Sequence, residues 1–235
     1  MKVMKFGGTS VGSPDRMKNV ASLITESGDP TFVVLSAMSG TTNSLIEISN
    51  YLYKKNPDGA NEVINKLEKK YMQHVEELYS TDEYKEKTRE FLREEFKYMR
   101  SFTKDIFTSF EEKSIVAQGE IMSTNMVLNY LQEQGIKATL LSAFDFMRTD
   151  KNAEPDAQYI KEKLTAIMTE NEGYQIYITQ GFICLNAYGE IDNLQRGGSD
   201  FTASLIGVAL GAEEIQIWTD IDGMHNNDPR VVEHT

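Results

Sequence analysis

Apolar runs of strand length alternate with amphipathic segments along most of the chain. The runs predict strands at residues 1–6, 31–36, 137–141, 175–179 and 214–218, with extended chain continuing to residue 186. Apolar residues recur at helical spacing in the segments 14–26, 115–134, 157–169 and 199–210. Alternating strands and helices predict a mainly parallel sheet with helices on both faces.

Residues 51–112 have a different character. They are rich in Lys and Glu, contain almost no glycine, and carry Tyr, Phe, Leu and Met at helical intervals. This pattern predicts two or three amphipathic helices inserted into the α/β alternation. A lid and a dimer surface are possible roles, but the pattern favours a solvated structural helix pair.

Composition and charge narrow the class of protein. The 235 residues suffice for one large domain or two small ones, and no apolar run approaches the ~20 residues of a membrane span. The N-terminus lacks the features of a signal peptide, and the single cysteine, Cys184, lies in an apolar run, which predicts a buried thiol in a cytoplasmic protein. The formal net charge of -12 argues against nucleic acid or an anionic membrane as a partner, and the scattered histidines do not predict a metal site.

The first strand ends in the loop Lys5-Phe6-Gly7-Gly8-Thr9-Ser10. Backbone N–H groups freed by glycines beside a helix N-terminus can hold an anion, most often phosphate. The lysine precedes the glycines, so the loop matches neither the P-loop nor the dinucleotide fingerprint. Taken alone, it is explained equally well as an ordinary strand–turn–helix junction.

Further polar clusters follow along the chain. They are the loop 39–43, the pair Gly119-Glu120, the helix start Arg196-Gly197-Gly198-Ser199-Asp200, and the strand end Thr219-Asp220 followed by Asp228-Pro229-Arg230. An arginine can clamp a carboxylate with two hydrogen bonds, although an ion pair at a helix cap is the plainer interpretation. Since ligands of parallel sheets bind at the carboxyl ends of strands, we expect these clusters to converge on one site.

In this order the motifs resemble the aspartate kinase family, the branch of the amino acid kinase superfamily that phosphorylates the side-chain carboxylate of aspartate. The resemblance covers residues 1–235 and implies an α/β fold, a three-layer α/β/α sandwich with a mainly parallel central sheet, in which about 51–112 form a helical insertion. Family members continue with the rest of the catalytic domain and with regulatory ACT domains. We therefore expect a catalytic domain truncated at its C-terminal end, of low activity in isolation.

The resemblance also implies a phosphate and nucleotide site. Lys5, Gly7 and Gly8 would hold the transferring phosphate, and Asp200 would organise Lys5, which makes Lys5 and Asp200 the catalytic pair. The ATP site would be lined by Thr219, Asp220, His225 and Arg230. The implied cofactors are ATP and Mg²⁺, with the metal bound through the ATP phosphates rather than by a protein metal site.

Aspartate would be bound on the other side of the same site. The resemblance places Glu120 on its ammonium and Arg196 on its α-carboxylate, with Thr42, Ser36 and Ser199 beside them. A carboxylate with a pKa of about 4 is already ionised at neutral pH, so this nucleophile needs no general base.

The implied activity is transfer of the γ-phosphate of ATP to L-aspartate, the first step of lysine, threonine and methionine biosynthesis, by a protein expected to form a homodimer at full length. Two departures from the family pattern concern Gln195, which replaces a glycine, and His225, which replaces a tyrosine that often packs on adenine. A glutamate or nucleotide monophosphate kinase of the same superfamily, and a non-catalytic ligand-binding module, remain as alternatives.

Overall fold

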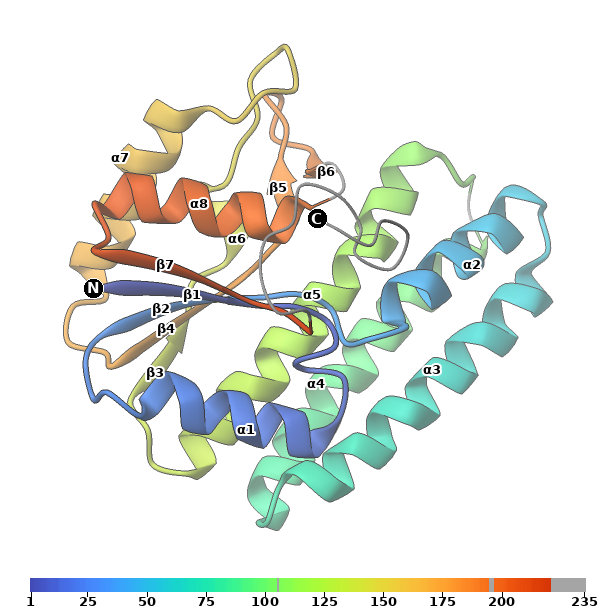
Figure 1. Cartoon of the computed structure of the whole chain (residues 1–235). Helices are drawn as coiled ribbons and strands as arrows, with labels where there is room; N and C mark the ends of the chain where they lie inside the picture. The colour runs from blue at the N-terminus through green and yellow to red at the C-terminus, as the bar shows by residue number, and fades with distance from the viewer. Residues whose placement is uncertain (105, 195–196, 221–235) are drawn as a thin grey trace, which may run out of the picture.

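A parallel five-stranded sheet forms the centre of the molecule, for which the computed structural model describes residues 1–104, 106–194 and 197–220 (Figure 1). Its strands lie in the order β3-β4-β2-β1-β7, and every neighbouring pair is parallel. They are β1 (Lys2–Phe6), β2 (Thr31–Leu35), β3 (Ala138–Leu140), β4 (Ile176–Gln180) and β7 (Glu214–Trp218). The predicted mainly parallel sheet is confirmed.

Helices cover both faces of this sheet. On one face lie α7 (Ala157–Glu170) and α8 (Gly198–Leu210); on the other lie α1 (Pro14–Thr25) and α5 (Ser109–Glu133) (Figure 1). Successive strand residues enter different cores: Val33 packs in the core on the α1 and α5 side, whereas Phe32 and Val34 pack in the core on the α8 side. The expected three-layer α/β/α sandwich is therefore confirmed.

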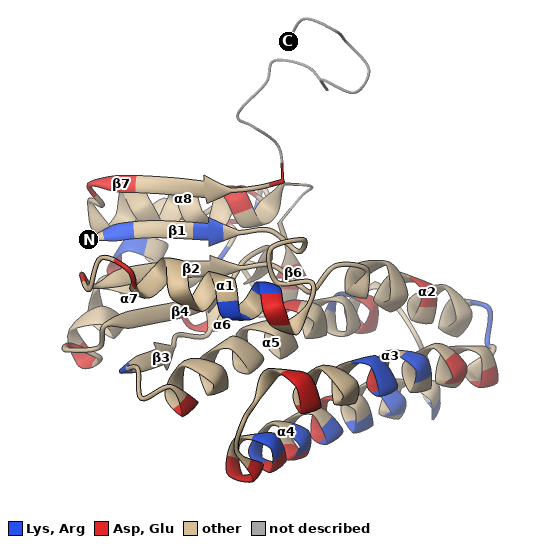
Figure 2. Cartoon of the chain, turned by 60° about the horizontal axis from the view of Figure 1, so that its bottom comes forward, with Lys and Arg blue, Asp and Glu red and all other residues tan. Residues whose placement is uncertain are grey.

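The helices expected in residues 51–112 are α3 (Pro57–Leu78) and α4 (Asp82–Ser101), followed by the short 3₁₀ turn η1 (Phe102–Lys104) and preceded by α2 (Thr41–Tyr53). Charged residues are numerous on α3 and α4 (Figure 2), but the apolar faces of these helices bury Tyr71 and Phe96 in the same core as residues of β1 and β2. The pair is thus part of the main core as well as solvated. That it is an insertion relative to the family stays a prediction.

A few elements differ from the prediction. Helix α5 begins at Ser109 rather than near residue 115, because Thr108 and Glu111 form a capping box. The four-residue α6 (Ala143–Phe146) was not predicted, nor was β6 (Ile191–Asn193), which pairs antiparallel with β5 (Ile183–Leu185) in the extended chain foreseen there. These short elements leave the sheet topology unchanged.

Two expectations from composition can be compared with the described residues. Cys184 is buried and its thiol is free, as expected, and burial raises the pKa of this thiol to about 12. Among the helices of the described ranges, none combines the length and the apolar character needed to cross a membrane.

Candidate functional site

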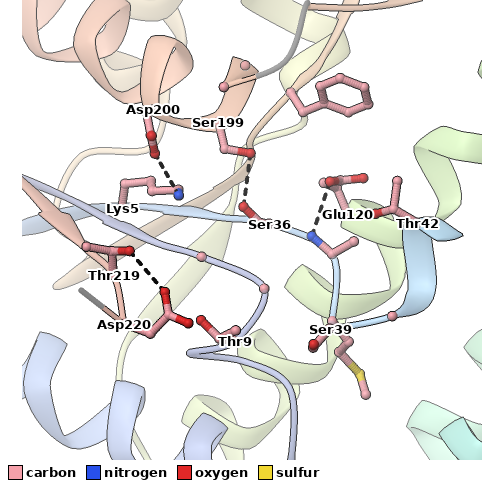
Figure 3. A pocket seen from close by; sticks show the side chains of 18 of the residues that line it. Lys5, Thr9, Ser36, Ser39, Thr42, Glu120, Ser199, Asp200, Thr219 and Asp220 are labelled. Atoms are coloured by element: carbon pink, nitrogen blue, oxygen red, sulfur yellow. Dashed lines mark hydrogen bonds and ion pairs between the residues drawn. The ribbon is translucent and has the colours of Figure 1, made fainter. Parts of the chain in front are cut away.

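A cavity of about 520 Å³ lies where β1, β2 and β7 end. It is open to solvent and collects residues from segments that are far apart in the chain (Figure 3). The predicted site residues that line it are Lys5, Gly7, Gly8, Ser36, Thr42, Glu120, Ser199, Asp200, Thr219 and Asp220. The expected convergence at the carboxyl ends of the strands is therefore observed.

Lys5 and Asp200 form an ion pair in this cavity. The distance from Lys5 Nζ to Asp200 Oδ1 is 2.6 Å, and the Lys5 side chain is only 11% exposed whereas that of Asp200 is 52% exposed. Lys5 is near the end of β1 and Asp200 is in the first turn of α8. The carboxylate thus holds the lysine ammonium at the cavity wall.

The two glycines after Lys5 allow the backbone to approach closely. A Cβ on Gly8 would lie 2.7 Å from the carbonyl oxygen of Ala37, and Ser39 N–H donates to the carbonyl oxygen of Gly8 at 3.0 Å. A Cβ on Gly7 would lie 3.6 Å from Lys5 Nζ. Gly8 is therefore required by packing between the loops after β1 and β2, and Gly7 keeps the space beside the ammonium open.

Helices α2 and α8 begin at the cavity without a side-chain cap. Their N-cap residues are Gly40 and Gly197, with φ of +81° and +85°, and no side chain accepts from their first N–H groups. Five other helices of the described ranges, α1, α3, α4, α5 and α7, do have a side-chain cap. The first turns of α2 and α8, with their N–H groups and helix dipoles, thus lie at the cavity and suit an anion.

Glu120 supplies an acidic group on the opposite side of the cavity from the Lys5 pair (Figure 3). It is 4% exposed; its Oε1 accepts from Ala37 N–H at 3.2 Å, and its Oε2 has no hydrogen-bond partner among the described residues. Burial raises the pKa of Glu120 to about 8, although the Ala37 hydrogen bond acts in the opposite direction. A buried acid with one unpaired oxygen is suited to a cationic ligand.

Glu120 reaches the cavity from the middle of α5, inside the helix predicted over residues 115–134. Gly119 makes this possible, because a Cβ there would lie only 2.7 Å from Cβ of Ala37. The close packing of α5 on the loop after β2 brings the carboxyl group into the site.

Two serines lie between these charged groups (Figure 3). Ser36 Oγ donates to Ser199 Oγ at 3.0 Å, and Ser123 Oγ donates to the carbonyl oxygen of Ser36 at 2.8 Å. Thr42 lines the cavity from the first turn of α2. The hydroxyl groups therefore offer hydrogen bonds to a ligand that spans the cavity.

Thr219 and Asp220 follow β7 and lie on the Lys5 side of the site, away from Glu120 (Figure 3). The side-chain oxygens Thr219 Oγ1 and Asp220 Oδ1 are 3.3 Å apart. The predicted site residues Arg196, His225 and Arg230, and the variant position Gln195, lie outside the described residues. Within the described ranges no group of three or more His, Cys, Asp and Glu side chains could hold a metal ion.

Sequence reasoning missed Phe182, which lines the cavity with a φ of +71°. It also missed two contacts from α3: Tyr71 OH lies 3.0 Å from Thr41 Oγ1, and Lys70 Nζ donates to the carbonyl oxygen of Ser39 at 3.0 Å. A glycine directly after β4 was the one available signal for Phe182, because glycine at a strand end often marks a close backbone approach.

Comparisons with known proteins identify a matching family model and several similar proteins. A family model described as "Amino acid kinase family" matches residues 1–235. The chain is 33% identical over 235 residues to "Lysine-sensitive aspartokinase 3" of Escherichia coli (strain K12), covering 98% of this chain and 51% of the relative. It is 34% identical over 238 residues to "Aspartokinase 2, chloroplastic" of Arabidopsis thaliana, covering 97% of this chain and 43% of the relative.

Among solved structures, the crystal structure of E. coli aspartokinase III in complex with aspartate and ADP (R-state) superposes with a TM-score of 0.84 at 32% identity. The superposition covers 99% of this chain and 52% of that one. The chain thus spans about half the length of the curated relatives it matches.

Proposed function

Since the chain belongs to the amino acid kinase family, we propose that it carries the catalytic site of an aspartate kinase, which transfers the γ-phosphoryl group of ATP to the side-chain carboxylate of L-aspartate. The observation that carries this proposal is Glu120, a buried carboxyl group whose Oε2 has no partner among the described residues, in the same cavity as the Lys5–Asp200 pair. A site for an ammonium group opposite a site for phosphate suits an amino-acid acceptor. The similarity to aspartokinases supports the same choice.

The acceptor would lie across the Glu120 side of the cavity. Glu120 Oε2 would bind the aspartate ammonium, which satisfies its unpaired oxygen, and Arg196 would bind the α-carboxylate. Ser36, Ser199 and Thr42 would hydrogen-bond to the carboxylate groups. The β-carboxylate would then point toward the Lys5 side, where the phosphoryl group arrives.

The donor would lie at the Lys5 side. Lys5, the glycine loop and the uncapped starts of α2 and α8 supply positive charge and N–H donors for phosphate oxygens, while Asp200 holds Lys5 in place. Thr219, Asp220, His225 and Arg230 would line the nucleotide. Mg²⁺ would enter with the ATP phosphates and neutralise their charge, since Mg²⁺ binds through waters, phosphates and one or two carboxylates rather than through a protein cage.

The reaction balances without a proton. A carboxylate oxygen supplies the electron pair of the new O–P bond, and the bond from the γ-phosphorus to the β–γ bridging oxygen breaks with its pair on ADP. Since the acceptor is ionised at the start, no general base is required, and catalysis depends on in-line positioning and charge neutralisation. The Lys5 ammonium and the N–H groups at the starts of α2 and α8 supply the charge and the donors that this requires.

We also propose that the chain is the catalytic domain of a longer, homodimeric protein of lysine, threonine and methionine biosynthesis. The similarity to proteins about twice its length supports the first part. The free, buried Cys184 suits the reducing cytoplasm, where we place the reaction.

ADP release by the protein that contains this chain tests the activity. MgATP is supplied with L-aspartate, L-glutamate or UMP, and hydroxylamine traps an acyl phosphate as its hydroxamate. We expect ADP release and hydroxamate formation with aspartate. Turnover with glutamate or UMP instead would assign another kinase of the family, and aspartate binding without turnover would assign a non-catalytic binding module.

Lys5→Ala and Asp200→Ala test the residue roles in the same assay. Lys5→Ala removes a positive charge that would stabilise the transition state, and it should lower kcat at least about 100-fold. Asp200→Ala removes the carboxylate that holds Lys5 in place, and it should lower kcat through that loss of positioning. Lys2→Ala, at the other end of β1, and Asp15→Ala, in the first turn of α1, are matched controls that should retain activity. Full aspartate-dependent turnover in both site variants would reject the proposed mechanism.

A further inference from the structure

Phe182 has a positive φ, which is unusual for a bulky residue. Three non-glycine residues of the described ranges have positive φ: Lys55 (+52°), Ala153 (+60°) and Phe182 (+71°). Lys55 and Ala153 are exposed turn residues that do not line the site cavity, whereas Phe182 does. A positive φ in a bulky residue is costly and often marks a functional position.

The strain belongs to a tight turn after β4. Ile183 N–H donates to the carbonyl oxygen of Gly181 at 2.8 Å, which closes a three-residue turn centred on Phe182. Contacts on both sides hold it: Phe182 N–H donates to Thr202 Oγ1 at 3.1 Å, and Leu194 N–H donates to the carbonyl oxygen of Phe182 at 2.7 Å. The surrounding structure therefore fixes the strained conformation.

This turn presses against the first turn of α8. A Cβ on Gly198 would lie 2.9 Å from Cδ2 of Phe182, and a Cβ on Gly181 would lie 2.6 Å from Cβ of Ser199. The ring is only partly buried; it packs against both hydrophobic cores and also lines the cavity beside Ser199. The turn thus places an aromatic surface next to Ser199, in the cavity that Glu120 also lines.

We propose that Phe182 is a specificity-determining residue, whose ring forms the apolar wall that limits the length of the amino-acid acceptor. This inference rests on the proposed function, because the acceptor is defined there. Polar groups at the cavity read the ammonium and carboxylates, which aspartate and glutamate share. The two differ by one methylene, which a shaped apolar wall discriminates by about 10–200-fold.

Phe182→Ala and Phe182→Leu test this in the whole protein, with kcat/KM measured for aspartate and for glutamate. We expect the ratio of glutamate to aspartate kcat/KM to rise at least about tenfold in Phe182→Ala, mainly through KM, since the alanine leaves room for one methylene. Phe182→Leu, which keeps apolar volume without the ring, should raise the ratio less. Ala153→Gly and Lys55→Gly, at the other positive-φ positions, should leave it unchanged.

A purely structural role predicts a different result. It would lower activity toward both acceptors by the same factor, together with the melting temperature, and that outcome would overturn the inference. If Phe182→Ala does not fold, Phe182→Leu decides, and an unchanged ratio there overturns it as well. Absence of aspartate-dependent ADP release from the unmodified protein would instead reject the proposed function.

Discussion

Replacement of Glu120 by glutamine should stabilise the protein above neutral pH while removing aspartate-dependent activity. The side chain is 4% exposed, and among the described residues only Oε1 has a hydrogen-bond partner, the N–H of Ala37. A glutamine keeps an oxygen that can accept this hydrogen bond and carries no charge. The change therefore removes the cost of burying a carboxylate with little change of shape.

The size of the effect follows from proton linkage. Burial raises the pKa of Glu120 from 4.5 to about 8, so between these pH values the folded protein holds a proton that the unfolded chain has released. Ionisation of Glu120 therefore leaves the free energy of unfolding unchanged below pH 4.5 and lowers it progressively as the pH rises toward 8. At about 1.4 kcal/mol per pH unit, the loss at pH 8 is roughly 2–5 kcal/mol.

Urea unfolding of the unmodified protein and of Glu120→Gln at pH 5 and pH 8 measures this loss. We expect the two proteins to agree within about 1 kcal/mol at pH 5, and the variant to be more stable by roughly 2–5 kcal/mol at pH 8. Glu90→Gln replaces an exposed acid of α4 and controls for a general effect of charge. It should shift stability by less than about 0.5 kcal/mol at both pH values.

One outcome would refute the reasoning. The expected result is a stability difference between Glu120→Gln and the unmodified protein that changes with pH. If the variant is instead less stable by the same amount at pH 5 and at pH 8, ionisation of the Glu120 carboxyl group does not oppose folding. The ADP-release assay on the same variant separates stability from function. A variant that is stable but does not respond to aspartate fits a residue kept for binding at a cost in stability.

The same site gives three further predictions. Because Glu120 must be ionised to bind an ammonium group, the KM for aspartate should fall roughly three- to tenfold between pH 6.5 and 7.5, as steady-state kinetics would show, and a flat profile would contradict this. Tyr71→Phe, which removes the hydroxyl beside Thr41 at the start of α2, should raise this KM severalfold with little change in kcat and lower the free energy of unfolding by about 1 kcal/mol. Gly8→Ala should destabilise the protein by about 1–3 kcal/mol because its Cβ would meet a carbonyl oxygen at 2.7 Å. Gly7→Ala should melt as the unmodified protein does and lose turnover, whereas equal melting temperatures for both glycine variants would contradict the packing argument.

The strands of the sheet could be predicted from continuous apolar runs, and the long helices could be predicted because apolar residues recur at helical spacing over enough positions to define a face. Elements of three or four residues, such as β6 and α6, contain too few positions for a period to be visible. The start of α5 is a different case. Thr108 and Glu111 have capping-box spacing, so the sequence contained that signal, although the apolar pattern that defined the prediction begins later.

In the candidate site, too, some residues could be predicted from the sequence and others depend on tertiary contacts. The meeting of Lys5 and Asp200 at one site was expected because strand ends and helix starts of a parallel sheet lie at one edge, whereas their pairing was implied by the family resemblance. The environment of Glu120 could not be predicted from the order of the motifs. It depends on the close approach of α5 to the loop at Ala37, which Gly119 allows and which buries Oε2 without a partner among the described residues. The positive φ of Phe182 is harder still to predict from the sequence, because it is held by hydrogen bonds with Leu194 and Thr202, which are 12 and 20 positions away. The residues that we assign to reading the acceptor are therefore those whose properties are created by tertiary contacts, and variants of these residues test the proposal more severely than variants of the motif lysine.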